Sequence, residues 1–201
     1  MVIEVRSAVP ADRDRVAATL TDAFANDPIL SWMFGAFPPS ANRLGRLFDI
    51  VLAEEFRKPA HLVETTEDAS GAAIWLDVGD SGMSNADIAR NAPRMLSLFR
   101  TGIGRTLRLM SAMDASHPKE PHRYLYFVGV RRAAQGTGVG AALLASVLDR
   151  CDAEGIPAYL ENSNPANTAF YARHGFLERP ATGFPSGAPP MMPMWREPRS
   201  A

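Results

Sequence analysis

From Val128 to Ala141 the chain reads Val-Gly-Val-Arg-Arg-Ala-Ala-Gln-Gly-Thr-Gly-Val-Gly-Ala, and this stretch decides the fold. An apolar run rich in β-forming residues, Tyr124 to Val128, leads into it. Beyond the glycines, apolar residues recur at the spacing of one helix face, at Val139, Leu143, Leu144, Val147 and Leu148. The pattern predicts a strand, a basic glycine-rich loop and an amphipathic helix, in that order.

The glycine-rich loop has the composition of an anion-binding loop. Gly136, Gly138 and Gly140 let the backbone turn tightly and let a bulky anion approach the main chain. The free N–H groups of the first helical turn and the positive end of the helix dipole favour negative charge. The loop therefore predicts a site for a diphosphate.

A dinucleotide is one of two ligands that fit this description. Residues 136–141 satisfy G-x-G-x-x-A, and Glu161 lies 20 residues after Ala141 at the end of another apolar run. However, residues 131–135 separate the strand from the first glycine, whereas a dinucleotide fingerprint begins directly at the strand end. Only 40 residues follow Glu161, too few for the further strands of such a sheet. These positions argue against a nicotinamide cofactor.

The other interpretation takes Gln135 as the first position of the motif. Gln135-x-x-Gly138-x-Gly140 resembles the acyl-CoA-binding signature of the GNAT acyltransferase superfamily, Q/R-x-x-G-x-G/A. Residues 164–176, Asn-Pro-Ala-Asn-Thr-Ala-Phe-Tyr-Ala-Arg-His-Gly-Phe, are similar to that family's later motif, an asparagine followed by F-Y-x-x-x-G-F. The resemblance implies an α/β (α+β) GNAT fold, in which helices flank a mixed central β-sheet, as a single domain over residues 1–201. It also implies an acetyl-CoA-dependent N-acetyltransferase that acylates a primary amine by direct transfer without a metal.

The same resemblance assigns a donor site to the strand, the loop and the later motif. The strand backbone would pair with the pantetheine arm, the loop would hold the pyrophosphate, and the asparagine would lie near the pantetheine. The residues assigned to acyl-CoA binding are Phe127, Val128, Val130, Gln135, Gly136, Thr137, Gly138, Val139, Gly140, Ala141, Asn167 and Phe170. Arg131 and Arg132 could add phosphate contacts or simply be exposed loop residues.

Two residues are predicted to be catalytic. Tyr171 matches the family tyrosine that lies near the sulfur and protonates the departing thiolate, which a phenol can do; packing of a helix on the sheet is the alternative. Glu161 ends the predicted strand Ala158–Glu161, which should run parallel to the strand before the loop, and could accept the proton of the amine. The Leu160-Glu161 pair looks like a segment of puromycin N-acetyltransferase-type enzymes, although a structural carboxylate is equally compatible with this position.

The first half of the chain matches the family only in the order of its elements. Periodicity predicts helices over residues 11–25 and 41–57, a hairpin of strands at 61–65 and 71–78, and, because of Pro193, an edge strand or strand end at 191–196. By the resemblance, the region between the first two helices lines the acceptor pocket, with ordinary core as the alternative. The acceptor-side candidates are Phe24, Asp27, Trp32 and Phe34.

Residues 79–121 are predicted to be a mostly helical insertion, interrupted at Gly102 and Gly104. The shortest chains of this type carry fewer residues there, so we expect a lid or a wall of the acceptor pocket. The arginines at positions 90, 94, 100, 105 and 108 are more typical of a solvated helix face than of a phosphate site.

The composition limits the classes of partner that we expect the protein to bind. With 21 Lys and Arg against 22 Asp and Glu, the formal charge is −1, so the chain has no basic field for nucleic acid or an anionic membrane. No apolar run approaches the ~20 residues of a membrane span, and the first residues lack the order of a signal peptide, so we expect a cytoplasmic protein. The four histidines, at 61, 117, 122 and 174, lack paired metal-ligand spacing.

The expected partner is a small-molecule amine, and the expected assembly is a monomer or a homodimer. Two other functions stay open: a catalytically silent acyl-CoA-binding module, and a protein N-terminal or lysine acetyltransferase. No long acidic or aromatic peptide groove can be read from the sequence. A small acceptor is therefore favoured.

Overall fold

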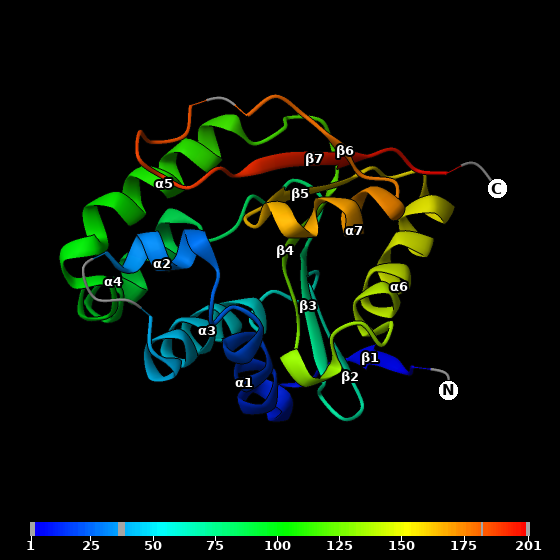
Figure 1. The fold of residues 1–201 in the computed structure, drawn as a ribbon, viewed down its shortest axis with the longest axis horizontal. Coiled ribbons are helices and arrows are strands. Elements are labelled where there is room, and N and C mark those ends of the chain that lie inside the picture. The colour runs from blue at the N-terminus through cyan, green and yellow to red at the C-terminus, as the bar shows by residue number, and fades with distance from the viewer. Residues whose placement is uncertain (1–2, 36–38, 182, 200–201) are drawn as a thin grey trace.

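The computed structural model describes residues 3–35, 39–181 and 183–199. In this part of the chain, strands form one mixed sheet in the order β1-β2-β3-β4-β5-β7-β6, with helices on both faces (Figure 1). The strands are β1 (Val5–Ser7), β2 (Leu62–Thr66), β3 (Gly71–Leu76), β4 (Arg123–Val130), β5 (Ala158–Asn162), β6 (Leu177–Glu178) and β7 (Met192–Arg196). Neighbouring strands are antiparallel except β4 and β5, which are parallel. The predicted mixed sheet flanked by helices is confirmed.

Two layers of helices cover the sheet. One comprises α1 (Arg13–Ala23), α2 (Pro28–Phe34), α3 (Ala41–Glu55), α4 (Asn85–Phe99) and α5 (Ile103–Ser116), and the other α6 (Val139–Glu154) and α7 (Thr168–Arg173). Successive strand residues point to opposite faces, so β3 contributes Ile74 to the core under the first layer and Trp75 to the core under α6. Both side chains are fully buried.

The elements predicted from periodicity are present. The helices expected over 11–25 and 41–57 are α1 and α3, and the expected hairpin is formed by β2 and β3, with Leu62 opposite Trp75. The segment 29–34 is the short helix α2, which begins with Asp27 as N-cap and Pro28 in its first turn.

The segment 79–121 is mostly helical, as predicted, and breaks between α4 and α5 at a 3₁₀ turn, Arg100–Gly102. Gly102 allows this junction to lie directly on the end of α2, because a Cβ there would lie 2.1 Å from the carbonyl oxygen of Met33. Gly104 lies inside α5. The glycine at the break therefore serves the packing of α2 against the helical segment.

The last long strand differs from the prediction. β7 has a neighbour on each side, since β5 pairs along its length and β6 pairs with Met194 and Trp195, so the expectation of an edge strand is wrong, whereas the alternative of a strand end holds, because Pro193 is the second residue of β7. Pro193 is tolerated there because its carbonyl oxygen accepts from Arg179 N (2.8 Å), which places its nitrogen on the side away from β5. The missing N–H therefore costs no bond to β5.

β4 and β5 separate soon after they meet. Their pairing is confined to Arg123 with Ala158 and Tyr124 with Tyr159, and β4 then runs away from β5 (Figure 1). β4 also carries a bulge at Tyr126, because its register with β3 shifts between Ile74 and Trp75. The bulge turns Tyr126 and Phe127 toward the same core. The separation leaves one edge of β4 without a strand partner from Leu125 onward.

None of the helices among the described residues is both long enough and apolar enough to span a membrane.

Candidate active site

A cavity of about 1350 Å³ lies where β4 and β5 separate. Residues of β4, β5, the glycine-rich loop and α7 line one part of it. The α1–α2 junction, α2, α4, α5 and the loop 79–84 line the rest. Segments that are far apart in the sequence therefore meet around one space.

The glycine-rich loop opens directly onto α6. Gly136 and Gly138 have φ angles of +78° and +95°, values that side-chain-bearing residues rarely adopt. The first hydrogen bond of α6 runs from Ala142 N to Gly138 O, so the amides of the preceding turn have no acceptor within the helix. Gly136, Gly138 and Gly140 line the cavity. The arrangement suits an anion held by main-chain N–H groups.

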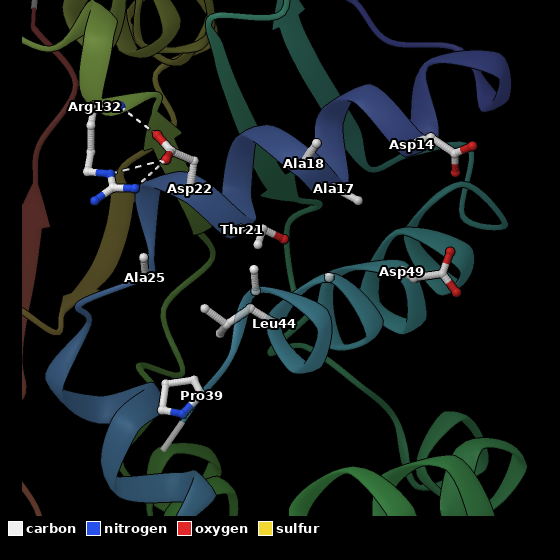
Figure 2. A pocket seen from close by; sticks show the side chains of 12 residues that line it. Asp14, Ala17, Ala18, Thr21, Asp22, Ala25, Pro39, Leu44, Asp49 and Arg132 are labelled. Atoms are coloured by element: carbon white, nitrogen blue, oxygen red, sulfur yellow. Dashed lines mark hydrogen bonds and ion pairs between the residues drawn. The ribbon is translucent and has the colours of Figure 1, made fainter. Parts of the chain in front are cut away.

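Two arginines fix this loop to the first helical layer. Arg131 Nε donates to Thr19 Oγ1 (2.9 Å) and to Ala69 O (3.0 Å). The amide and guanidinium of Arg132 both donate to the Asp22 carboxylate, at 2.7 and 2.9 Å (Figure 2). These contacts hold the loop in place.

Figure 2 shows a second, smaller pocket of about 480 Å³ between α1 and α3, for which the Arg132–Asp22 pair forms one end. Its walls carry small residues such as Ala17 and Ala18. Neither Glu161 nor Tyr171 lines it. The larger cavity is therefore the candidate active site.

Most of the predicted donor residues line the larger cavity. They are Phe127, Val128, Val130, Gln135, Gly136, Gly138, Gly140, Ala141, Asn167 and Phe170. Val139 instead lies in the core beside Leu143, and the exposed Thr137 donates its hydroxyl to Ala134 O (2.7 Å). Gln135 Nε2 donates to Val130 O (3.2 Å), which closes the loop onto the end of β4. The binding role of each residue stays a prediction.

Glu161 lies at the end of β5 and faces the cavity. Its two carboxylate oxygens accept from the hydroxyls of Tyr124 (2.5 Å) and Tyr159 (2.9 Å). Burial raises the pKa of Glu161 to about 7, although the two hydroxyl donors favour the carboxylate and oppose the rise. A carboxyl group with such a pKa can exchange a proton near neutral pH, as a general base must.

Tyr171 lies on α7, is 8% exposed and lines the same cavity. Burial, and to a smaller extent the nearby Asp27 carboxylate, raise the pKa of Tyr171 above its ordinary value. The phenol therefore keeps its proton at neutral pH and can donate it.

The acceptor-side candidates divide into two pairs. Phe24 and Asp27 line the cavity. Asp27 accepts from Leu30 N (2.8 Å) and from Ser163 Oγ (2.5 Å), and burial raises the pKa of its carboxyl group. Trp32 and Phe34 lie outside the lining: Phe34 is fully buried and stacks on Phe99 with a centroid distance of 5.1 Å. The Arg105 guanidinium lies 5.4 Å from the Trp32 ring. These two side chains have the surroundings of packing residues.

The sequence interpretation missed several lining residues. The lining residues Tyr124, Tyr126 and Asp80 were not singled out, and neither was Tyr159, which lies behind the lining and donates to Glu161. One signal was available, because Tyr159 and Glu161 are two residues apart on a strand and so share a face. The pairing of Tyr124 with Tyr159 depends on a register that the sequence does not state.

Two of the four histidines, His117 and His122, lie together. His122 Nε2 lies 3.0 Å from His117 Nε2 within an aromatic group that includes Tyr124, Tyr159 and Trp195. Burial and the neighbouring His122 lower the pKa of His117 to about 4. Across the described ranges, no group of three or more His, Cys, Asp or Glu side chains is arranged to hold a metal ion.

Comparisons with known proteins agree with this geometry. The sequence profile of the Acetyltransferase (GNAT) family matches residues 97–176. An uncharacterized N-acetyltransferase of Schizosaccharomyces pombe is 30% identical over 178 residues, which make up 83% of this chain and 71% of that protein.

Solved structures show the same fold over nearly the whole chain. A crystal structure of the histone acetyltransferase HPA2 and related acetyltransferase from Corynebacterium glutamicum has a TM-score of 0.69 and 27% identity, covering 100% of this chain and 99% of that one. PaiA N-acetyltransferase from Thermoplasma acidophilum, solved in complex with coenzyme A, has a TM-score of 0.57 with coverage of 98% and 99%; at 12% identity it shows the fold alone. On the sequence matches and the shared fold, the chain belongs to the GNAT acetyltransferase family and is an N-acetyltransferase.

Proposed function

We propose that this enzyme transfers an acetyl group from acetyl-CoA directly to a primary amine of a small molecule, with Glu161 as general base and Tyr171 as general acid. The observation that supports the proposal most strongly is that both side chains line one cavity while their proton affinities differ. Glu161 has a pKa of about 7, and the pKa of Tyr171 is raised above the ordinary value of tyrosine. Glu161 can therefore take up a proton near neutral pH, and Tyr171 carries a proton there, although its raised pKa makes it a weaker acid than an ordinary tyrosine.

The donor would bind along the separated edge of β4. From Leu125 onward this edge has no pairing with β5, so its N–H and C=O groups can bond to the amide-bearing pantetheine arm of coenzyme A. The amides of residues 136–141 and the N-terminus of α6 would hold the pyrophosphate. Asn167 and Phe170 line the cavity on the α7 side of the same space.

The proton balance of the reaction fits the two side chains. The lone pair of the neutral amine attacks the thioester carbonyl, and Glu161 accepts, directly or through water, the proton that the nitrogen loses as the amide forms. As the C–N bond forms and the C–S bond breaks, Tyr171 gives its proton to the sulfur. The phenolate then regains a proton from solvent, and Glu161 releases its own. Holding donor and acceptor in one cavity supplies the proximity that such a transfer needs.

The helices around the acceptor space support a small molecule. Side chains of α2, α4, α5 and the loop 79–84 surround it, so the helical segment before β4 forms a wall of the cavity. A protein N-terminus or lysine side chain is the alternative acceptor, and it would have to reach Glu161 past these helices.

A thiol-release assay tests the proposal. Acetyl-CoA is incubated with wild type or Tyr171→Phe and a panel of small primary amines and short peptides, and the acetylated product is identified by mass. We expect amine-dependent thiol release by wild type and a kcat roughly a hundredfold lower in Tyr171→Phe. Thermal stabilisation by acetyl-CoA, absent with NADH, controls for donor binding and folding in both proteins.

Three outcomes would change the proposal. If peptides were acetylated in preference to every small amine, the proposed acceptor would be a protein amine and not a small molecule. A Tyr171→Phe enzyme that binds acetyl-CoA and keeps the wild-type kcat would remove the acid role of Tyr171. If acetyl-CoA binds but no thiol is released with any acceptor, the silent acyl-CoA-binding module would replace the transferase.

A further inference from the structure

The positively charged side chains that line the cavity are confined to its donor side, where Asp22 also lines it and pairs with Arg132. Its two arginines, Arg132 and Arg173, lie on the glycine-rich loop and on α7, where the donor would bind. Away from them, the lining contains Asp27, Asp80, Asp114 and Glu161, and among the described residues no lysine or arginine lines that part. This half of the cavity would attract a cation and oppose an anion.

The same half is otherwise apolar. Methionines contribute much of its surface, at Met33, Met83, Met95, Met110, Met113 and Met191. Methionine side chains are flexible and polarisable, so they adapt to apolar ligands of varied shape. The combination of apolar surface and carboxylates suits a molecule that has a long apolar body and positive charge.

Each of the four carboxylates has a local partner. The oxygens of Asp27 accept from Leu30 N and Ser163 Oγ, and those of Glu161 accept from two tyrosine hydroxyls. Asp114 Oδ1 accepts from Ser81 Oγ (3.2 Å). Asp80 differs, because its partner is the buried side chain of His61, which we call the brace of Asp80 together with Glu55.

The brace runs from α3 through the start of β2 to the loop after β3. His61 Nε2 bonds to Asp80 Oδ2 (2.5 Å), while His61 Nδ1 bonds to Glu55. The side chains of Glu55 and His61 are at most 1% exposed, whereas that of Asp80 is 50% exposed and lines the cavity. The carboxylate of Asp80 is therefore fixed on one side and open to a ligand on the other.

A protonated His61 lets both ring nitrogens donate to the two carboxylates. Burial alone would lower the pKa of His61, but the hydrogen bonds to Glu55 and Asp80 outweigh it and raise the pKa above the ordinary value. Lys58 adds positive charge nearby and opposes this rise. With His61 charged, the group Glu55–His61–Asp80 keeps one net negative charge, and its open end is Asp80.

We propose that the acceptor is an amine with an extended apolar body and a second, positively charged group, and that Asp80 binds that second group. The first amine is acetylated near Glu161, and the apolar body lies along the methionines between the two ends. His61 and Glu55 are positioning residues that orient Asp80. This inference rests on the proposed function, since it names the acceptor class for the same site.

A matched pair of acceptors tests the anchor. The enzyme is assayed with 1,8-diaminooctane and with octylamine, which differ only in the second amine. An apolar cavity without an anchor would favour octylamine, because a second ammonium loses hydration on entry. We expect wild type to prefer the diamine in kcat/KM, and Asp80→Asn to lower the diamine-to-octylamine ratio about tenfold.

Asp49→Asn is the control, since it removes the same charge from a residue on α3 that pairs with Arg13 and does not line the cavity. We expect this variant to keep the wild-type ratio. Preference of wild type for octylamine would overturn the inference, as would an unchanged ratio in Asp80→Asn. If Asp80→Asn does not fold, the wild-type enzyme is assayed with diamines of increasing length. An anchor at a fixed distance gives an optimum length in kcat/KM, and the absence of an optimum would overturn the inference.

Calorimetric binding of the diamine in the presence of coenzyme A separates this inference from the proposed function. If both amines are acetylated without preference and Asp80→Asn binds the diamine as wild type does, the anchor is refuted and the transferase stands. If neither amine is acetylated but the diamine binds in a manner that requires Asp80, the proposed function fails and the anchor stands.

Discussion

The donor and acceptor halves of the cavity are built in different ways. The donor half is mostly main chain: the free edge of β4, the turn with positive φ angles at Gly136 and Gly138, and the first turn of α6. The acceptor half consists of side chains from α2, the loop 79–84, α4 and α5. In the proposed assignment, donor recognition depends mostly on residues 125–141, with Asn167 and Phe170 added from the α7 region, whereas acceptor recognition is spread over the chain.

The two halves also differ in how firmly they are held. Arg131 and Arg132 fix the glycine-rich loop to α1 and to the β2–β3 turn through several hydrogen bonds. The lining of the acceptor half includes six methionines, whose side chains are flexible. We infer that one half binds a constant ligand and that the other half can be altered without loss of the fold.

After Tyr171→Phe, the substitution expected to lower kcat most is Glu161→Gln. Because the pKa of Glu161 is raised to about 7, Glu161, the proposed general base, is protonated below that pH and ionised above it. Wild-type kcat should rise with pH through about 7, measured with an acceptor amine that stays unprotonated across the range. Glu161→Gln should lower kcat by about a hundredfold and remove that dependence on pH.

Glu64→Gln is the matched control for this experiment. Glu64 is also a buried carboxyl whose pKa is raised by burial, but it bonds to Ser146 in the core and does not line the cavity. Its replacement should leave kcat and the pH profile close to those of wild type. A pH profile that survives in Glu161→Gln would assign the base to another group, and Asp27 is then the next candidate.

The same contrast explains what could be predicted from the sequence. The strand, loop and α6 follow from local periodicity and glycine spacing, and the parallel pairing of β4 with β5 follows from the connection between them. The placement of Tyr124 beside Tyr159 could not be derived, because it depends on register. The bulge at Tyr126 is equally invisible, since it arises from the pairing of β4 with β3.

The residues that line the acceptor half were harder to predict from the sequence, and the reason is physical. Trp32, Phe34 and Phe24 are all aromatic residues of the region before α3, yet only Phe24 lines the cavity, because Phe34 packs on Phe99 and Trp32 lies beside Arg105. The brace of Asp80 joins Glu55, His61 and Asp80 from three segments. No spacing in the sequence marks such a group, since its members come together only when α3, β2 and β3 pack.

A glycine substitution on the donor side should produce a smaller effect that is confined to one substrate. Gly138 has a φ of +95°, so Gly138→Ala strains the turn by about 1–2 kcal/mol or shifts the amides that follow. We expect the KM for acetyl-CoA to rise about tenfold and the KM for the amine to stay within twofold of wild type. Steady-state kinetics with each substrate varied in turn measures both constants.

Gly155→Ala is the control, because it introduces backbone strain at a glycine that lies away from the proposed acetyl-CoA site. Gly155 ends the same helix with a φ of +68°, and a Cβ there meets nothing within 4 Å. It should lower the thermal stability as Gly138→Ala does, while the KM for acetyl-CoA remains that of wild type. Equal effects of the two variants on the acetyl-CoA constant would break the proposed division between the two halves of the cavity.

The smallest effect is expected from Tyr159→Phe, which alters the acceptor half without touching the donor. The Tyr159 hydroxyl donates to Glu161 at 2.9 Å and favours its carboxylate, so loss of the hydroxyl should raise the pKa of Glu161 further. A lost hydrogen bond of about 1 kcal/mol corresponds to a shift of roughly 0.7 pH units. The rise of kcat with pH should therefore move to higher pH, giving a severalfold loss below pH 7 and almost none at pH 9, with an unchanged KM for acetyl-CoA. A uniform loss at every pH would mean that Tyr159 positions Glu161 and leaves its proton affinity unaltered, whereas a shift to lower pH would contradict the assignment of Glu161 as the titrating base.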